Sequence, residues 1–253
     1  MDRLIHTALN SLANLRDTRV IQAQNLASQT VPGFRRDLVN EGDPRFLQAM
    51  DAASGRAFQT ERGPHEFSSA PGMLNQTGEP MDIAIAEEGW FFIQPDGGGD
   101  PALSRRGDLR LTAQGRLVNG AGEAMLDQAL QPIDLPPVRS ITIDEVGRIT
   151  FEAQDAPEGQ VTEGPVLATV IPDAGLALRK SPDGQVRAGD KPLPPPNQGA
   201  KVLQGVLEAS NVNTMEELVS SIELQRTFEL NLRMISTAKE LDESGSRLLR
   251  PPE

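Results

Sequence analysis

The C-terminal segment, residues 213–249, predicts one long helix whose apolar residues lie on two different sides. Such a helix would be roughly 50 Å long at 1.5 Å per residue. At about 100° per residue, the first apolar group shares one face: Met215, Leu218, Val219 and Ile222. The second group shares the opposite face: Leu224, Phe228, Leu232 and Ile235. A helix that docks on its own domain needs only one stripe. We therefore expect copies or relatives of this chain to cover the helix at different heights.

The N-terminal segment, up to about residue 27, predicts a second helix with one broad apolar face. Its members are Ile5, Ala8, Leu9, Leu12, Leu15, Ala23 and Leu26. Arg16 and Arg19 interrupt this face. Because charges are costly to bury unless paired, they either extend past the apolar seam or pair with an acid of a neighbouring terminal helix, such as Glu223 or Glu229.

The boundaries of these helices have local signals. Asn213, with Glu216 three residues later, is expected to cap the start of the C-terminal helix. The N-terminal helix is expected to stop at TVPGF, because Pro32 restricts the residue before it and Gly33 permits a turn.

Between the helical ends, short apolar runs alternate with turns rich in Gly, Pro and Asp, such as PDGGG, GAGE and EVGR. This pattern predicts about eight to ten strands. The expected fold class is α+β, with long N- and C-terminal helices paired as a helical domain and a central all-β domain. The expected boundaries are 1–34 for the N-terminal helix, 35–77 for an extended connector, 78–198 for the β domain and 199–253 for the C-terminal helix.

Composition excludes several kinds of protein. A net charge of −12 argues against a nucleic-acid binder, which presents a basic face to phosphate. The absence of Cys excludes disulfides and thiolate sites. No apolar run approaches the roughly 20 residues of a membrane span, and the N-terminus has no secretory h-region, so we expect neither membrane insertion nor a cleaved signal.

No motif predicts catalysis, a cofactor or a metal. His6 and His65 have no local partners for a metal or general-base site. PDGGGD lacks the ligands of an EF-hand, and GAGEAM lacks the third Gly of a dinucleotide loop; both predict turns. We do not expect an enzyme. A carboxylate pair that meets only in the fold leaves a secreted β-rich enzyme or glycan-binding protein as an alternative.

Four blocks of the sequence resemble signature segments of the bacterial flagellar rod and hook family: QNLASQTVPGFRRD, QTGEPMDIAIAEEGWFFIQ, SRRGDLRLTAQGRLVNGAGEAML and LEASNVNTMEELVSSIELQRTFELN. The first is similar to N-[LI]-A-N-x-x-T-P-G-[FY], matching at Asn25, Leu26, Ala27, Pro32, Gly33 and Phe34. Ser28 and Val31 stand where Asn and Thr are usual. The family often has a D-G turn where this chain has Asp144 to Gly147, so the turn type there is left open.

The resemblance implies a structural subunit that polymerises through its terminal helices into the helical drive shaft of the flagellar basal body. Length and ending are most similar to proximal-rod members, with distal-rod or hook subunits as alternatives. Implied partners are other rod subunits, copies of itself and the flagellar export apparatus. The implied location is the periplasm-spanning rod. The expected assembly interface combines motif residues and helix faces: Ile5, Leu9, Leu12, Arg16, Arg19, Asn25, Leu26, Pro32, Gly33, Phe34, Asn211, Asn213, Met215, Leu218, Val219, Ile222, Leu224, Gln225, Arg226, Phe228, Leu232 and Ile235.

Overall fold

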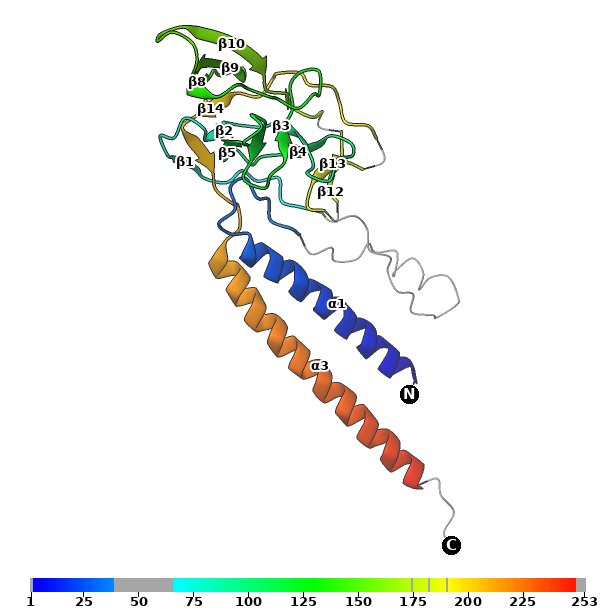
Figure 1. The fold of residues 1–253 in the computed structure, drawn as a ribbon. Coiled ribbons are helices and arrows are strands. Elements are labelled where there is room, and N and C mark those ends of the chain that lie inside the picture. Colours follow the sequence, from blue (N-terminus) through cyan, green and yellow to red (C-terminus); the bar gives the residue numbers. More distant parts are fainter. Residues whose placement is uncertain (1, 39–65, 174, 182, 190, 249–253) are drawn as a thin grey trace. The chain divides into compact units, whose positions relative to one another are not determined.

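The computed structural model of the chain describes residues 2–38, 66–173, 175–181, 183–189 and 191–248 (Figure 1). The chain divides into two compact units. The helical unit comprises the described residues within 1–27, 37–63 and 213–253, and the β unit comprises the described residues within 28–36 and 64–212. The β unit therefore includes a short segment from the N-terminal part of the chain.

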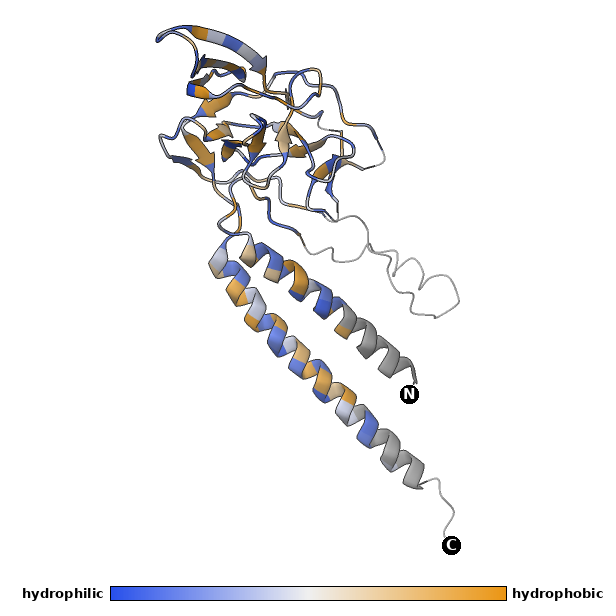
Figure 2. Ribbon diagram, in the orientation of Figure 1, coloured by the Kyte–Doolittle hydropathy of each residue, from blue (hydrophilic) through white to orange (hydrophobic). Residues whose placement is uncertain are grey.

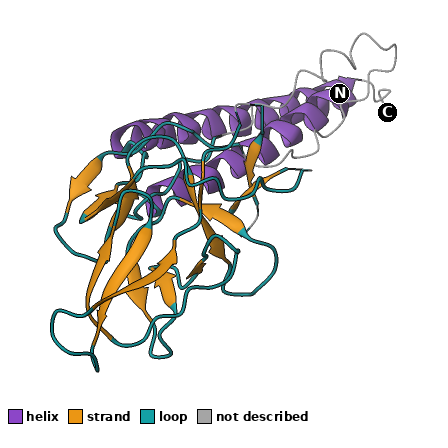
Figure 3. Ribbon diagram, turned by 90° about the horizontal axis from the view of Figure 1, so that it is seen from above, coloured by secondary structure: helices purple, strands orange, loops and turns teal. Residues whose placement is uncertain are grey.

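The helical unit contains α1 (Asp2–Ala27) and α3 (Thr214–Leu248), which lie side by side (Figures 1 and 3). Side chains three or four residues apart form a half-buried or buried stripe on α3: Glu217, Ser220, Leu224, Phe228, Asn231 and Ile235. The matching stripe on α1 is Leu12, Leu15, Thr18, Gln22 and Asn25. This spacing keeps one face of each helix toward the other. Neither described helix is long and apolar enough to span a membrane.

The predicted cap at the start of α3 and the predicted turn after α1 are confirmed. Asn213 Oδ1 accepts hydrogen bonds from the backbone N–H groups of Met215 (3.1 Å) and Glu216 (3.4 Å), which makes Asn213 the N-cap of α3. After α1, the Val31 N–H donates to the Ser28 carbonyl at 3.1 Å, and Gly33 has a φ of 66°. Gly33 thus supplies the left-handed residue that the turn requires.

The expected fold class is wrong. The described residues contain two helices and fifteen strands, so the chain is mostly β, with its strands in several sheets. The terminal helices lie side by side, but both hydrophobic core clusters of the described residues belong to the β unit, so the helices are not the separate packed domain that was expected. Two helices alone enclose little core, and large apolar side chains of α3 remain exposed: Met215, Leu218, Val219, Ile222, Leu230, Leu232 and Met234. Figure 2 shows hydrophobic and hydrophilic positions interleaved along α3.

The strands pair antiparallel throughout. The largest sheet has the order β12-β13-β4-β3-β7-β6-β5, with β11 also paired to β3. Its strands are β3 (Trp90–Gln94), β4 (Ala102–Ser104), β5 (Leu109–Leu111), β6 (Leu117–Asn119), β7 (Ala124–Met125), β11 (Thr169–Val170), β12 (Leu178–Lys180) and β13 (Val186–Ala188). A second sheet contains β8 (Val138–Ile143), β9 (Arg148–Ala153) and β10 (Val161–Val166). Two strand pairs complete the unit: β1 (Leu74–Gln76) with β15 (Val206–Glu208), and β2 (Ile83–Ile85) with β14 (Val202–Gln204).

Strand β3 joins the two hydrophobic clusters of the β unit. Phe91 and Ile93 belong to the larger cluster, whereas Trp90 and Phe92 belong to the smaller one. Successive side chains of a strand point to opposite faces, so β3 is covered on both sides. That double burial explains why WFFIQ is a continuous apolar run rather than an alternating one.

The turn between β8 and β9 uses Gly147 in place of a D-G pair. Gly147 has a φ of 83°, and its N–H donates to the Asp144 carbonyl at 3.0 Å. The Asp144 carboxylate accepts the N–H groups of Val146 (3.1 Å) and Arg148 (2.7 Å). The loop is longer than a D-G turn, and its left-handed position comes at the end.

Candidate assembly site

In the helical unit, Asn25 joins three segments through one buried side chain. Its Nδ2 donates to the Asp37 carbonyl at 2.9 Å and to Glu217 Oε1 at 3.3 Å. Its Oδ1 accepts the Asp37 N–H at 2.8 Å. Asn25 is 1% exposed. Because buried amides need these partners, Asn25 sets the relative position of α1, α3 and the chain at residue 37.

Asn25→Ala is expected to destabilise the helical unit by about 2–3 kcal/mol, since buried groups at Asp37 and Glu217 lose their Asn25 partner. The expected readout is faster amide hydrogen exchange at Asp37, whose N–H donates to Asn25 Oδ1. Gln24→Ala is the matched control, because the adjacent Gln24 side chain is exposed. Unchanged exchange at Asp37 in Asn25→Ala would contradict this role.

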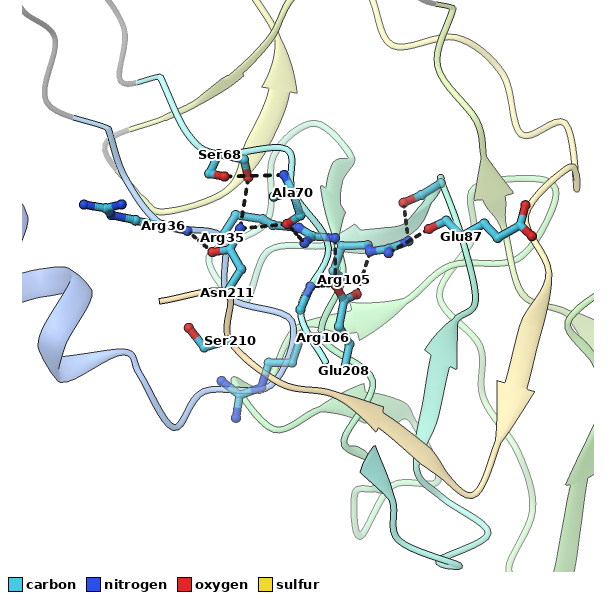
Figure 4. A network of polar contacts seen from close by, with 12 residues as sticks. Arg35, Arg36, Ser68, Ala70, Glu87, Arg105, Arg106, Glu208, Ser210 and Asn211 are labelled. Carbon is cyan, nitrogen blue, oxygen red and sulfur yellow. Dashed lines mark hydrogen bonds and ion pairs between the residues drawn. The ribbon is translucent and has the colours of Figure 1, made fainter. Parts of the chain in front are cut away.

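In the β unit, Glu208, Arg35 and Arg105 form a buried ionic cluster, which we call the Glu208 cluster (Figure 4). Glu208 Oε1 lies 2.8 Å from Arg35 Nη2, and Glu208 Oε2 lies 2.7 Å from Arg105 Nε. The Gly72 N–H also donates to Glu208 Oε1, at 2.8 Å. One carboxylate of β15 therefore holds segments from three distant parts of the chain.

Two cations share the single carboxylate of the Glu208 cluster. The side chains of Arg35 and Arg105 are 5% and 3% exposed, and that of Glu208 is 1% exposed. Burial lowers the pKa of Arg35 to about 10, although Glu208 opposes this shift. Burial also lowers the pKa of Arg105. The lowered pKa values mean that the loss of hydration on burying both guanidiniums is larger than the electrostatic stabilisation that Glu208 gives them. Without this carboxylate, the two buried charges would have no compensation.

Further hydrogen bonds hold the Arg35 segment in the β unit. Asn211 Oδ1 accepts the Arg36 N–H at 2.6 Å, and Asn211 Nδ2 donates to the Ala70 carbonyl at 2.7 Å. Lys180 Nζ donates to the Arg35 carbonyl at 3.1 Å and lies 3.9 Å from the centre of the Phe34 ring. Asn211 and Phe34 were both expected at the assembly interface. In the subunit they instead make contacts within the β unit.

The apolar faces of α3 differ in exposure. Leu224, Phe228 and Ile235 lie in the stripe toward α1, together with Leu12 of α1. The other predicted α3 residues are exposed: Met215, Leu218, Val219, Ile222, Gln225, Arg226 and Leu232. On the opposite face from the stripe, Met215 and Ile222 are 72% and 69% exposed. Apolar side chains of this size at helical spacing make a patch suited to a protein partner.

The remaining predicted residues are more varied. Arg16 Nε lies 3.8 Å from Asp17 Oδ1, with the Arg16 side chain 83% exposed, and Arg19 is also exposed. Leu26 and Pro32 are half-buried. The side chains of Ile5 and Leu9 lie outside the described part of the structure, as do those of His6 and His65.

The Glu208 cluster is the feature that sequence reasoning missed. Glu208 and Arg105 are 103 residues apart, and nothing local to either residue predicts burial. A weak signal was present. Charged residues occur beside otherwise apolar segments at VPGFRR, at ALSRR and at VLEAS, and such charges are buried only in pairs.

Comparison with known proteins gives matches over nearly the whole chain. Residues 203–248 match the family model described as flagellar basal body rod FlgEFG protein C-terminal. The chain is 28% identical to the flagellar basal-body rod protein FlgF of Salmonella typhimurium over 98% of this chain and 99% of the relative. It is 28% identical to the FlgF of Caulobacter vibrioides over 97% of each chain. It is 32% identical to the flagellar basal-body rod protein FlgG of Agrobacterium fabrum over 71% of this chain and 68% of the relative.

Proposed function

The chain belongs to the flagellar basal-body rod protein family, and we propose that it is a structural subunit of the proximal rod of the bacterial flagellum. The observation that carries this proposal is the end-to-end similarity to FlgF proteins of several bacteria. Similarity to FlgG proteins is compatible with a distal-rod role. It covers 90% of this chain for the Buchnera FlgG and 71% for the Agrobacterium FlgG, against 97–98% for the three FlgF proteins. The proximal rod is therefore the favoured reading.

Polymerisation through the terminal helices accounts for the exposed face of α3. Met215, Leu218, Val219 and Ile222 stay exposed while the opposite stripe is covered. Head-to-tail contacts that do not close produce a helical filament, and each subunit then needs a surface that complements a different surface of the next. The exposed α3 face supplies one such surface.

The finer features of the proposed role follow from family membership. The partners are other rod subunits and copies of this chain, with the flagellar export apparatus delivering the subunit. The location is the basal body. The chain acts by assembly, as the rod proteins that it resembles do.

Ile222→Arg tests the proposed interface. Ile222 is 69% exposed in the subunit, so the substitution should leave folding unaffected. An arginine in an apolar contact between subunits should lower incorporation into basal bodies at least about tenfold. The measurement is immunoblotting of purified basal bodies, with motility as a second readout. Ser221→Arg is the control, because Ser221 is exposed and precedes Ile222 without belonging to the apolar face. Normal incorporation of Ile222→Arg would remove this face from the interface. Absence of the wild-type chain from basal bodies would overturn the proposed function itself.

A further inference from the structure

Strand β1 is an edge strand whose outer side is unprotected. It pairs only with β15, in a two-stranded sheet, and no other described strand joins it. All three of its residues are exposed, and so is Met73 before it, at 77%. Leu74, in β1, is 42% exposed. An edge of this kind presents unpaired backbone groups to other chains.

The register shows which backbone groups face outward. The Met73 carbonyl accepts the Ala209 N–H at 2.7 Å, and the Thr77 N–H donates to the Gly205 carbonyl at 2.8 Å. In an antiparallel pair, alternate residues bond to the partner strand and the residues between them point away. Leu74 and Gln76 therefore direct their N–H and C=O groups to the free edge.

Another edge of the β unit is built differently. Strand β10 contains Gly164 and Pro165, and its pairing with β9 shifts register between Glu163 and Val166. Glu163 also forms an ion pair with Arg148 at 3.4 Å. Proline, irregular register and charge are the usual protections of an edge strand. The β1 edge, with the sequence Met-Leu-Asn-Gln, has none of them.

We propose that the β1 edge binds an extended segment of a second copy of this chain, which adds a third strand to the β1–β15 pair. This inference rests on the proposed function, since a polymerising subunit must contact its copies. Two chains of net charge −12 repel each other, so contacts between them favour uncharged surfaces such as this edge. The bound segment is not β1 itself, because a pair of identical edges closes a dimer.

Photo-crosslinking in cells tests the inference. Cells express two full-length forms with different epitope tags, and one form carries a photoreactive amino acid at Asn75. The expected product, in purified basal bodies, has the mass of two chains and carries both tags. The same photoreactive group at Thr162 of the protected β10 edge is the matched comparison, and it is expected to give at least tenfold less of this product.

Gln76→Pro adds a backbone test to the same crosslinking. Proline removes the outward N–H while leaving the bonds to β15, so the two-tag product should fall at least tenfold; Gln76→Ala keeps the N–H and should retain more of it. Crosslinks within one chain, to a protein other than this chain, or between two β1 strands would overturn the inference, as would equal crosslinking at Thr162. If the wild-type chain were missing from basal bodies, the proposed function would fail instead.

Discussion

Glu208→Gln is expected to destabilise the β unit by roughly 3–5 kcal/mol, the usual cost of removing one partner from a buried ion pair. Glutamine keeps the shape of the side chain but not its charge. Arg35 and Arg105 would then be two buried cations without a counter-charge. Gly72 would keep a weaker acceptor than the carboxylate it now has, which lies 2.8 Å from its N–H.

The single tryptophan of the chain makes this effect measurable. Trp90 belongs to the smaller hydrophobic cluster of the β unit, and the centre of its ring lies 5.9 Å from the Arg35 guanidinium carbon. Urea unfolding followed by Trp90 fluorescence therefore reports on the β unit. The control is Glu163→Gln, because the Glu163 side chain is 77% exposed and its pair with Arg148 contributes less than about 1 kcal/mol. Equal midpoints for the two variants would show that the Glu208 cluster is not what holds these segments together.

The lowered pKa of Arg35 shows how its charge affects the stability of the β unit. Its folded value, about 10, lies below the ordinary pKa of an arginine, so the folded state binds this proton less tightly than the unfolded state. The resulting cost to stability is fully present below about pH 10 and decreases as pH rises above that value. Arg35→Met removes this cost together with the charge. We therefore expect Arg35→Met to destabilise the β unit less than Glu208→Gln does.

Local signals in the sequence predicted the elements whose causes are local. The cap at Asn213, the turn at Gly33 that follows α1 and the strand at WFFIQ each depend on a few neighbouring residues, and each is found where expected. The strand β1 (LNQ) and the strand β12 (LRK) have no alternating pattern. β1 becomes a strand because the distant β15 pairs with it, and β12 because the nearby β13 pairs with it. Neither pairing has an alternating signal in the sequence, which is why the β content was underestimated and the fold class was wrong.

The candidate site divides in the same way. Helical periodicity separated the two apolar faces of α3, and the structure leaves one of them exposed. Periodicity could not predict the Glu208 cluster, because its members come from the segment after α1, the segment after β4 and the strand before α3. Both ends of the chain thus contribute to the β unit, and only the folded structure brings them together.

Gly33→Ala is expected to destabilise the β unit by about 2–5 kcal/mol, from left-handed backbone strain and from overpacking. Gly33 has a φ of 66°, and a Cβ there would lie 2.3 Å from the Arg105 carbonyl oxygen and 2.7 Å from the Arg106 nitrogen. Both atoms belong to the backbone that carries Arg105 into the Glu208 cluster. The Gly33 N–H also donates to the Glu208 carbonyl at 2.7 Å, so any shift of Gly33 disturbs β15.

Two exposed glycines separate the contributions at Gly33. Gly98 has a φ of 74° with nothing within 4 Å of an added Cβ, so Gly98→Ala reports left-handed strain alone, about 1–2 kcal/mol. Gly97 has neither a positive φ nor a neighbour within 4 Å, so Gly97→Ala should change stability by less than about 1 kcal/mol. The excess of Gly33→Ala over Gly98→Ala, read from the Trp90 transition, is the cost of separating the N-terminal segment from Arg105. If the two variants unfold at the same urea concentration, Gly33 serves only as a turn residue. An excess shows that the close approach itself requires glycine.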